Sequence, residues 1–143
     1  MPTRAEWQQL AEDRILDAHT LLNASAPRWS AAYYLVGYAV ECGLKSCVLV
    51  YLTAHPEVVF RDRKLSDDCW NHEIERLVKT ADLHATREAD SLANPALGVH
   101  WQIVIKWKES SRYEQKTRAD AERLYEAVTD PTNGVMQWIR ARW

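Results

Sequence analysis

The chain has 143 residues, of which 47% are hydrophobic and 27% charged, and its formal net charge at pH 7 is -2. These values are ordinary for one globular domain, so they exclude an intrinsically disordered chain and a fibrous repeat. They also exclude a globally basic nucleic-acid-binding protein, so any contact with RNA must come from a local cluster of arginine and lysine.

The N-terminal segment and the cysteines indicate in which cellular compartment the protein is found. Residues 1–17 are acidic and amphipathic, unlike the basic and then apolar start of a secretion signal. Cys42, Cys47 and Cys69 are odd in number and lack the paired short spacings of zinc sites and disulfide frameworks. We therefore expect a cytoplasmic protein without a metal or another cofactor.

Two long helices are expected first in the chain. Apolar residues recur at helical spacing from about Thr3 to Asn23, with polar residues on the opposite side. Pro27 interrupts this pattern, and Ser30 is a suitable N-cap for a second helix, which the His55-Pro56 pair ends.

The second helix contains the apolar run of residues 31–54, which is nearly long enough to span a bilayer. Glu41 and Lys45 lie near the centre of this run. Charges at that place favour a helix buried in the middle of a protein bundle, with no membrane involved.

The middle of the chain is expected to hold a loop and two helices. The stretch from Glu57 to Asp68 has no sustained period and ends in Ser66-Asp67-Asp68, a helix-starting signal, so we predict a loop there. A third helix is predicted from about Trp70 to Leu83, because one of its faces stays apolar. A short fourth helix is expected over Ala85 to Leu92.

The last part of the chain contains one ambiguity. Residues from Val99 to Trp107 alternate as in a strand but also suit a helix, and helix is favoured because no partner strand is visible. A long helix follows from about Glu114. Asp130 and Pro131 then offer a cap and a first-turn proline for a final helix, although Pro131 could equally mark a kink. The patterns together predict one all-α domain, a compact up-and-down bundle of about five helices over residues 1–143.

A polar stripe runs along the otherwise apolar second helix. Tyr34, Tyr38, Glu41 and Lys45 are spaced by four, three and four residues, so they share one side of the helix. Glu41 and Lys45 are in the favoured order for an ion pair one turn apart, and a structural ion pair accounts for them. Gly37, beside the stripe, allows another segment to approach closely.

Residues 31–45, with the sequence AAYYLVGYAVECGLK, closely resemble the signature helix of HEPN-domain proteins. Shorter patterns further along resemble later landmarks of one branch of that family, and together they cover most of the chain. These are Trp70-Asn-His72, Trp107 followed by Arg112-Tyr113, and the group of Ala121, Ala127-Val128 and Trp138-Ile139.

The resemblance implies a small HEPN-like helical bundle, usually a homodimer, from prokaryotic toxin-antitoxin, defence or stress systems. Many HEPN proteins are metal-independent ribonucleases that use an arginine and a histidine with typically about four to six residues between them. In such sites histidine acts as acid or base on the ribose 2′-hydroxyl while arginine stabilises charge on the phosphate.

We therefore expect a HEPN-like protein that binds RNA or a partner protein in a defence or toxin-antitoxin setting. One alternative is an active, metal-independent ribonuclease toxin with an antitoxin partner. Another is a non-catalytic module that regulates a nucleotidyltransferase or another enzyme.

Two sets of residues are candidates for the site. The family's spacing occurs at Arg14 and His19, on the first helix rather than a later one, and about one such match is expected by chance. Side chains five residues apart on a straight helix point about 140° away from each other.

The second set is a polar pocket formed by Glu41, Lys45, His72, Arg112 and Tyr113. A structural interpretation of the same residues stays open, in which Arg112 pairs with Glu41, Tyr113 packs its ring and His72 caps the third helix.

A cluster of basic and aromatic residues ends the sequence, with Arg140 and Arg142 lying between Trp138 and Trp143. We expect this cluster to be exposed at a chain end, where it could touch RNA or a partner chain.

Overall fold

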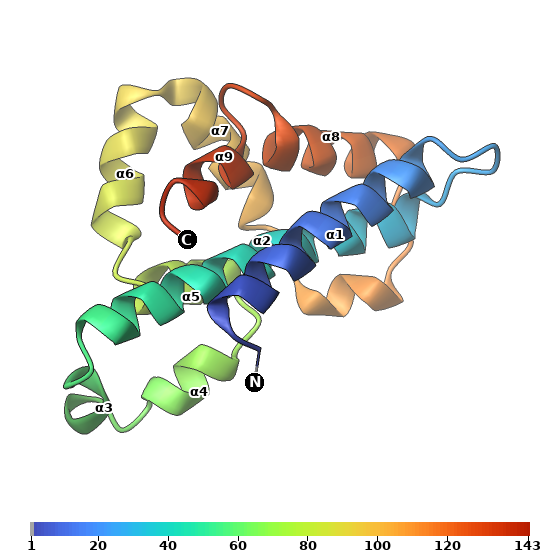
Figure 1. Ribbon diagram of the computed structural model, residues 1–143. Helices are drawn as coiled ribbons and strands as arrows, with labels where there is room; N and C mark the ends of the chain where they lie inside the picture. Colours follow the sequence, from blue (N-terminus) through green and yellow to red (C-terminus); the bar gives the residue numbers. More distant parts are fainter. Residues whose placement is uncertain (1) are drawn as a thin grey trace.

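The two longest helices of the computed structural model, which describes residues 2–143, run antiparallel along each other (Figure 1). Helix α1 spans Arg4–Leu22 and helix α2 spans Trp29–Ala54. α1 begins with a capping box, in which the Glu6 N–H donates to Thr3 Oγ1 and the Thr3 N–H donates to Glu6 Oε2. Both helices therefore form close to where the sequence predicts them.

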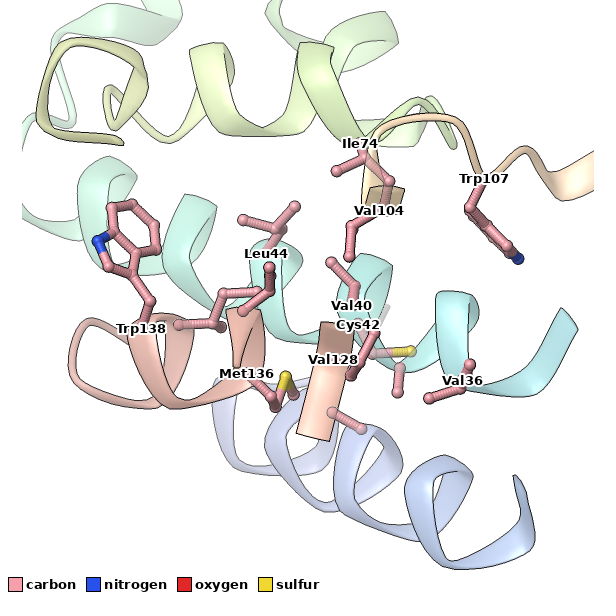
Figure 2. Close-up of a cluster of buried hydrophobic side chains, with 14 of the residues drawn as sticks. Val36, Val40, Cys42, Leu44, Ile74, Val104, Trp107, Val128, Met136 and Trp138 are labelled. Atoms are coloured by element: carbon pink, nitrogen blue, oxygen red, sulfur yellow. The ribbon is translucent and has the colours of Figure 1, made fainter. Parts of the chain in front are cut away.

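The core lies around the middle of α2. Nearly every residue from Val36 to Val48 is buried, because helices pack against α2 on several sides. Figure 2 shows side chains from other segments, among them Ile74, Val104 and Met136, converging on this part of α2. Burying each large apolar side chain contributes about 1.5–3 kcal/mol. α2 is long and apolar enough to cross a membrane, but 67% of its most apolar window is buried inside the fold.

The remaining helices are shorter and follow in quick succession. They are α3 (Val58–Arg61), α4 (Leu65–Trp70), α5 (Ile74–Thr80), α6 (His84–Ala93), α7 (Pro95–Val104), the 3₁₀ helix η1 (Glu109–Tyr113), α8 (Arg118–Thr129) and α9 (Val135–Arg140). The described residues form no strand, so the predicted all-α class is confirmed. They contain nine α-helices where about five were predicted; five of these, α1, α2, α6, α7 and α8, have ten residues or more.

The prediction of a loop from Glu57 to Asp68 was wrong, since this stretch contains α3 and most of α4. The predicted helix from Trp70 to Leu83 is interrupted before Ile74. The Asn71 side chain causes the interruption, because Asn71 Oδ1 accepts a hydrogen bond of 2.7 Å from the Glu73 N–H and competes with helical hydrogen bonding.

The C-terminal third also differs from the prediction in its boundaries. Helix is correct for most of the segment from Val99 to Trp107, but α7 ends at Val104. α8 begins only at Arg118, after a capping box at Thr117. Residues 131–133 form a turn after α8 rather than the first turn of the final helix, because the Asp130 side chain accepts from the Asn133 N–H.

Candidate functional site

A buried ion pair lies at the centre of α2. Glu41 is fully buried and Lys45 is 6% exposed, and Lys45 Nζ donates to Glu41 Oε1 over 2.9 Å. Lys45 Nζ also lies 5.0 Å from the centre of the Trp7 ring of α1, within the range of a cation-π contact. The predicted ion pair is therefore present and is shielded by the neighbouring helix.

His72 bonds to the same carboxylate oxygen from outside the core. It lies in the break between α4 and α5, and its Nδ1 is 2.8 Å from Glu41 Oε1. A carboxylate can only accept, so the proton in this bond belongs to Nδ1 of the imidazole. The His72 side chain remains 44% exposed, so the ring lies at the protein surface.

The 3₁₀ helix η1 supplies the next residues of the chain of contacts. Glu109 Oε2 lies 3.7 Å from His72 Nε2, and Glu109 Oε1 lies 3.3 Å from an Arg112 guanidinium nitrogen. The Arg112 guanidinium carbon in turn lies 4.8 Å from the centre of the Tyr113 ring. Tyr113 is 78% exposed, so the outer end of this chain faces solvent.

The five residues of the predicted polar pocket are thus connected in the order Lys45, Glu41, His72, Arg112 and Tyr113. The connection between His72 and Arg112 passes through Glu109, and sequence reasoning missed that residue. Its position three residues before Arg112 was the available signal, because that spacing favours an ion pair within a helical turn. We name this chain of contacts, Glu109 included, the His72–Arg112 site.

Three details of the structural interpretation were wrong. Arg112 pairs with Glu109 rather than with Glu41, and Tyr113 does not pack into the core. Within residues 2–143, the His72 side chain hydrogen-bonds to the Glu41 side chain and does not cap α5. Glu41 and Lys45 form a buried pair, whereas the side chains of His72, Arg112 and Tyr113 are exposed at the protein surface.

A cavity of about 570 Å³ opens beside His72. Its lining is mixed, with apolar surface from Ile105 and Trp107 and acidic groups from Glu73, Glu75 and Glu109. The Glu75 carboxylate already accepts two hydrogen bonds of 2.7 Å from Arg87. These bonds lower the pKa of Glu75 below its usual value and balance its charge.

Trp107 fixes the position of η1 against α2. The ring is 1% exposed and lies over Gly37, where an added Cβ atom would be 2.2 Å from ring atoms Cδ1 and Nε1. The Trp107 ring also stacks on Tyr34, with ring centres 5.9 Å apart. The missing side chain at Gly37 therefore allows the segment leading to Glu109 to approach the helix that carries Glu41.

Burial changes the chemistry of the groups beside Glu41. Removal from water raises the pKa of the Cys42 thiol to about 12, and the neighbouring Glu41 charge acts in the same direction. Burial likewise raises the pKa of Tyr38 to about 12. Both groups stay protonated at neutral pH, so neither acts as an anionic nucleophile in this site.

The other candidate pair lies on α1. Arg14 Nε is 2.9 Å from Asp17 Oδ2, and the exposed His19 ring lies 6.2 Å from the ring of Tyr125 on α8. Among the described residues, Arg14 and His19 form no hydrogen bond or ion pair with each other. Each residue has its own neighbours, and the two do not form a common site in this chain.

The C-terminal basic and aromatic cluster is mostly used within the fold, which corrects the expectation of an exposed cluster. Trp138 is 7% exposed, and its indole N–H donates to Asp90 Oδ2 over 2.8 Å. Arg142 lies over the Trp138 ring and also bonds to Asp90, and Arg140 forms two hydrogen bonds with Glu12. Most polar groups of the cluster are therefore engaged in contacts within the fold.

The fold and the site together define an all-α domain in which a buried ion pair orients an exposed histidine next to an arginine and a tyrosine. Comparison of the chain with models of protein families, with curated proteins and with solved structures finds no match.

Proposed function

We propose that this chain is a HEPN-like RNA-binding protein of a prokaryotic defence or toxin-antitoxin system, acting in the cytoplasm as a homodimer. The resemblance of residues 31–45 to the HEPN signature helix supports the family and the setting. One geometric observation carries the RNA contact: Tyr113 is 78% exposed, with the Arg112 guanidinium 4.8 Å from the centre of its ring.

An exposed tyrosine beside an arginine suits single-stranded RNA. An unpaired base can stack on the tyrosine ring, and such stacking contributes about 1–3 kcal/mol per base. The guanidinium can bind a backbone phosphate at the same time. With a net charge of -2, the protein has no general attraction for RNA, so binding depends on this local arrangement.

The test is the affinity of the protein for a single-stranded RNA oligonucleotide over a series of salt concentrations. Tyr113→Ala should weaken binding by about 5- to 150-fold through lost stacking. Arg112→Ala should weaken binding and reduce the slope of log affinity against log salt by about 0.7, the value for one phosphate contact with a single strand.

The matched control is Arg123→Ala, which removes an exposed arginine from the middle of α8. We expect this variant to bind RNA like the wild type. A wild-type protein that binds no RNA at low salt would contradict the proposal, as would an equal loss of affinity in Arg112→Ala and Arg123→Ala.

Metal-independent RNA cleavage is a second candidate function, favoured by the hydrogen bond from His72 to the buried Glu41 carboxylate. With its proton on Nδ1, the ring presents the lone pair of Nε2 and can act as a general base. Nε2 would take the proton of a ribose 2′-hydroxyl. The 2′-oxygen would attack the adjacent phosphorus, the bond to the 5′-oxygen would break and that oxygen would take a proton from water, leaving a 2′,3′-cyclic phosphate.

Cleavage should be measured with EDTA present, in the wild type, His72→Gln and His19→Ala. This proposal expects activity to be lost in His72→Gln and kept in His19→Ala. Loss in His19→Ala alone would place the reaction at Arg14 and His19 instead. Absence of cleavage above background in the wild type would remove this second function while leaving RNA binding untouched.

A further inference from the structure

We propose that His72 and Arg112 form a binding site for a phosphate group, and that the carboxylate of Glu109 occupies this site in the free protein. The proposal concerns an anion site whose competitor belongs to the same chain. It depends on the proposed function only in naming RNA as the source of the phosphate.

The first argument is the position of the Glu109 carboxylate. Its two oxygens face two different groups, with Oε2 at 3.7 Å from His72 Nε2 and Oε1 at 3.3 Å from Arg112. Charge-assisted hydrogen bonds between nitrogen and oxygen are usually about 2.7–2.9 Å long. Glu109 therefore bridges the two groups without a short bond to either one, and the arrangement leaves room for a better-fitting anion.

The second argument is that both binding groups are held by other residues. The His72 ring is fixed from the opposite side by its 2.8 Å bond to the fully buried Glu41. The Arg112 guanidinium lies against the Tyr113 ring. When Glu109 moves away, His72 and Arg112 keep these contacts, so the site is already organised for another anion.

The third argument is that Glu109 is well placed to leave. It is the first residue of the five-residue 3₁₀ helix η1, and 3₁₀ helices have poorer hydrogen-bond geometry than α-helices. Its side chain is 33% exposed and borders the cavity beside His72, so it can turn into solvent without crossing the core.

The chemistry of the two groups favours phosphate over another carboxylate. A guanidinium can donate two parallel hydrogen bonds to phosphate oxygens. When its ring carries both protons, His72 donates one N–H to Glu41 and the other to the bound anion. A tetrahedral phosphate can meet donors from both directions, whereas the planar carboxylate of Glu109 reaches them only at a distance.

The consequence is a competition between Glu109 and the ligand. A carboxylate tethered beside the site acts at a high local concentration, so it weakens the binding of isolated phosphate ions. A ligand that also stacks on Tyr113 brings extra binding energy and can displace Glu109. Competition with Glu109 therefore makes the site select a phosphate that is attached to a base over a free phosphate ion.

The experiment compares the wild type with Glu109→Gln, which keeps the size of the side chain and removes its charge. The probe is inorganic phosphate, and the readout is the shift of the His72 ring signals in an NMR titration. Both proteins are titrated in the same buffer and at the same pH. Glu109→Gln should bind phosphate at least about five-fold more tightly than the wild type, because a like charge near the anion is removed.

Two further variants make the result specific. Glu73→Gln removes another carboxylate that lines the same cavity and should leave the phosphate affinity within about two-fold of the wild type. Arg112→Ala in the Glu109→Gln background should abolish the gain. All variants should keep the wild-type melting temperature, since the altered side chains are exposed or half-buried.

Unchanged phosphate affinity in Glu109→Gln would overturn the inference, and so would a gain that persists without Arg112. A parallel titration with single-stranded RNA separates this inference from the proposed function. Tighter phosphate binding by Glu109→Gln, with no RNA binding by any variant, would support the anion site and refute RNA as its ligand. Tighter binding of both probes would support the two proposals together.

Discussion

Gly37→Ala tests whether the close approach of Trp107 to α2 positions the site. The added Cβ would lie 2.2 Å from Cδ1 and Nε1 of Trp107, whereas ordinary van der Waals contacts to a Cβ begin at 3.4 Å. The ring would have to move by about 1 Å, and it is buried and stacked on Tyr34.

The magnitude follows from two opposing effects. Replacing a glycine inside a helix by alanine stabilises the helix by about 1 kcal/mol. Overpacking a core typically costs about 1–3 kcal/mol, and the 2.2 Å distance places this case at the upper end. We therefore expect the free energy of unfolding to fall by about 1–2 kcal/mol in a urea titration.

The control is Gly98→Ala, a glycine inside α7. Its Cβ would lie 3.1 Å from the Ser91 carbonyl oxygen, which requires a shift of only a few tenths of an ångström. This variant should be neutral or more stable than the wild type by up to about 1 kcal/mol. If Gly37→Ala proves as stable as Gly98→Ala, the account of Trp107 as the residue that fixes η1 is wrong.

Three further predictions concern the buried ion pair, the cysteines and the start of α8. Lys45→Met should lower the free energy of unfolding by about 3–5 kcal/mol, because it leaves Glu41 buried without its cation. Adding Glu41→Leu to this variant should restore most of the lost stability. Urea titrations of both variants measure the two effects. In iodoacetamide labelling at pH 8, Cys42 should react only after unfolding, because its pKa of about 12 keeps the thiol protonated. The less buried Cys69 should react first. Rapid labelling of Cys42 in the folded protein would contradict its burial. Thr117→Ala removes the capping box of α8 and should lower the free energy of unfolding, measured by thermal unfolding, by about 1 kcal/mol. An unchanged stability would show that α8 does not need this cap.

The long helices could be predicted from the sequence because apolar residues recur at helical spacing in α1 and a long apolar run with clear end signals marks α2. α2 carries its apolar residues over seven turns, and the charges of Glu41 and Lys45 indicated a protein interior. α3 could not be predicted in this way, because it has four residues and none of them is buried. A helix that short shows no period in its sequence.

The breaks between helices were missed for a related reason. The buried apolar face of the predicted helix begins only at Ile74, after the interruption, and Trp70 is exposed, while Asn71 ends α4 through a local side-chain hydrogen bond. The apolar period records which face is buried but not whether the backbone stays helical. This break has a consequence for the site, since it places His72 outside a helix and against Glu41.

The residues that form the His72–Arg112 site could be predicted only in part from the sequence. Glu41 and Lys45 follow from helical spacing, but only tertiary packing brings His72 and Glu109 together, and no spacing in the sequence connects residue 72 with residue 109. The error on Trp138 has a similar origin. Its place near the chain end suggested exposure, whereas α9 packs against α2, α7 and α8 and buries the ring.

Ultraviolet crosslinking of a single-stranded RNA to the wild-type protein, followed by mass-spectrometric mapping of the modified peptides, tests the central claim most directly. The account predicts that the main crosslink falls on Tyr113, and that Arg112→Ala reduces its yield. Crosslinks confined to other exposed aromatic residues, such as Phe60 or Trp70, would contradict the assignment of RNA contact to the His72–Arg112 site.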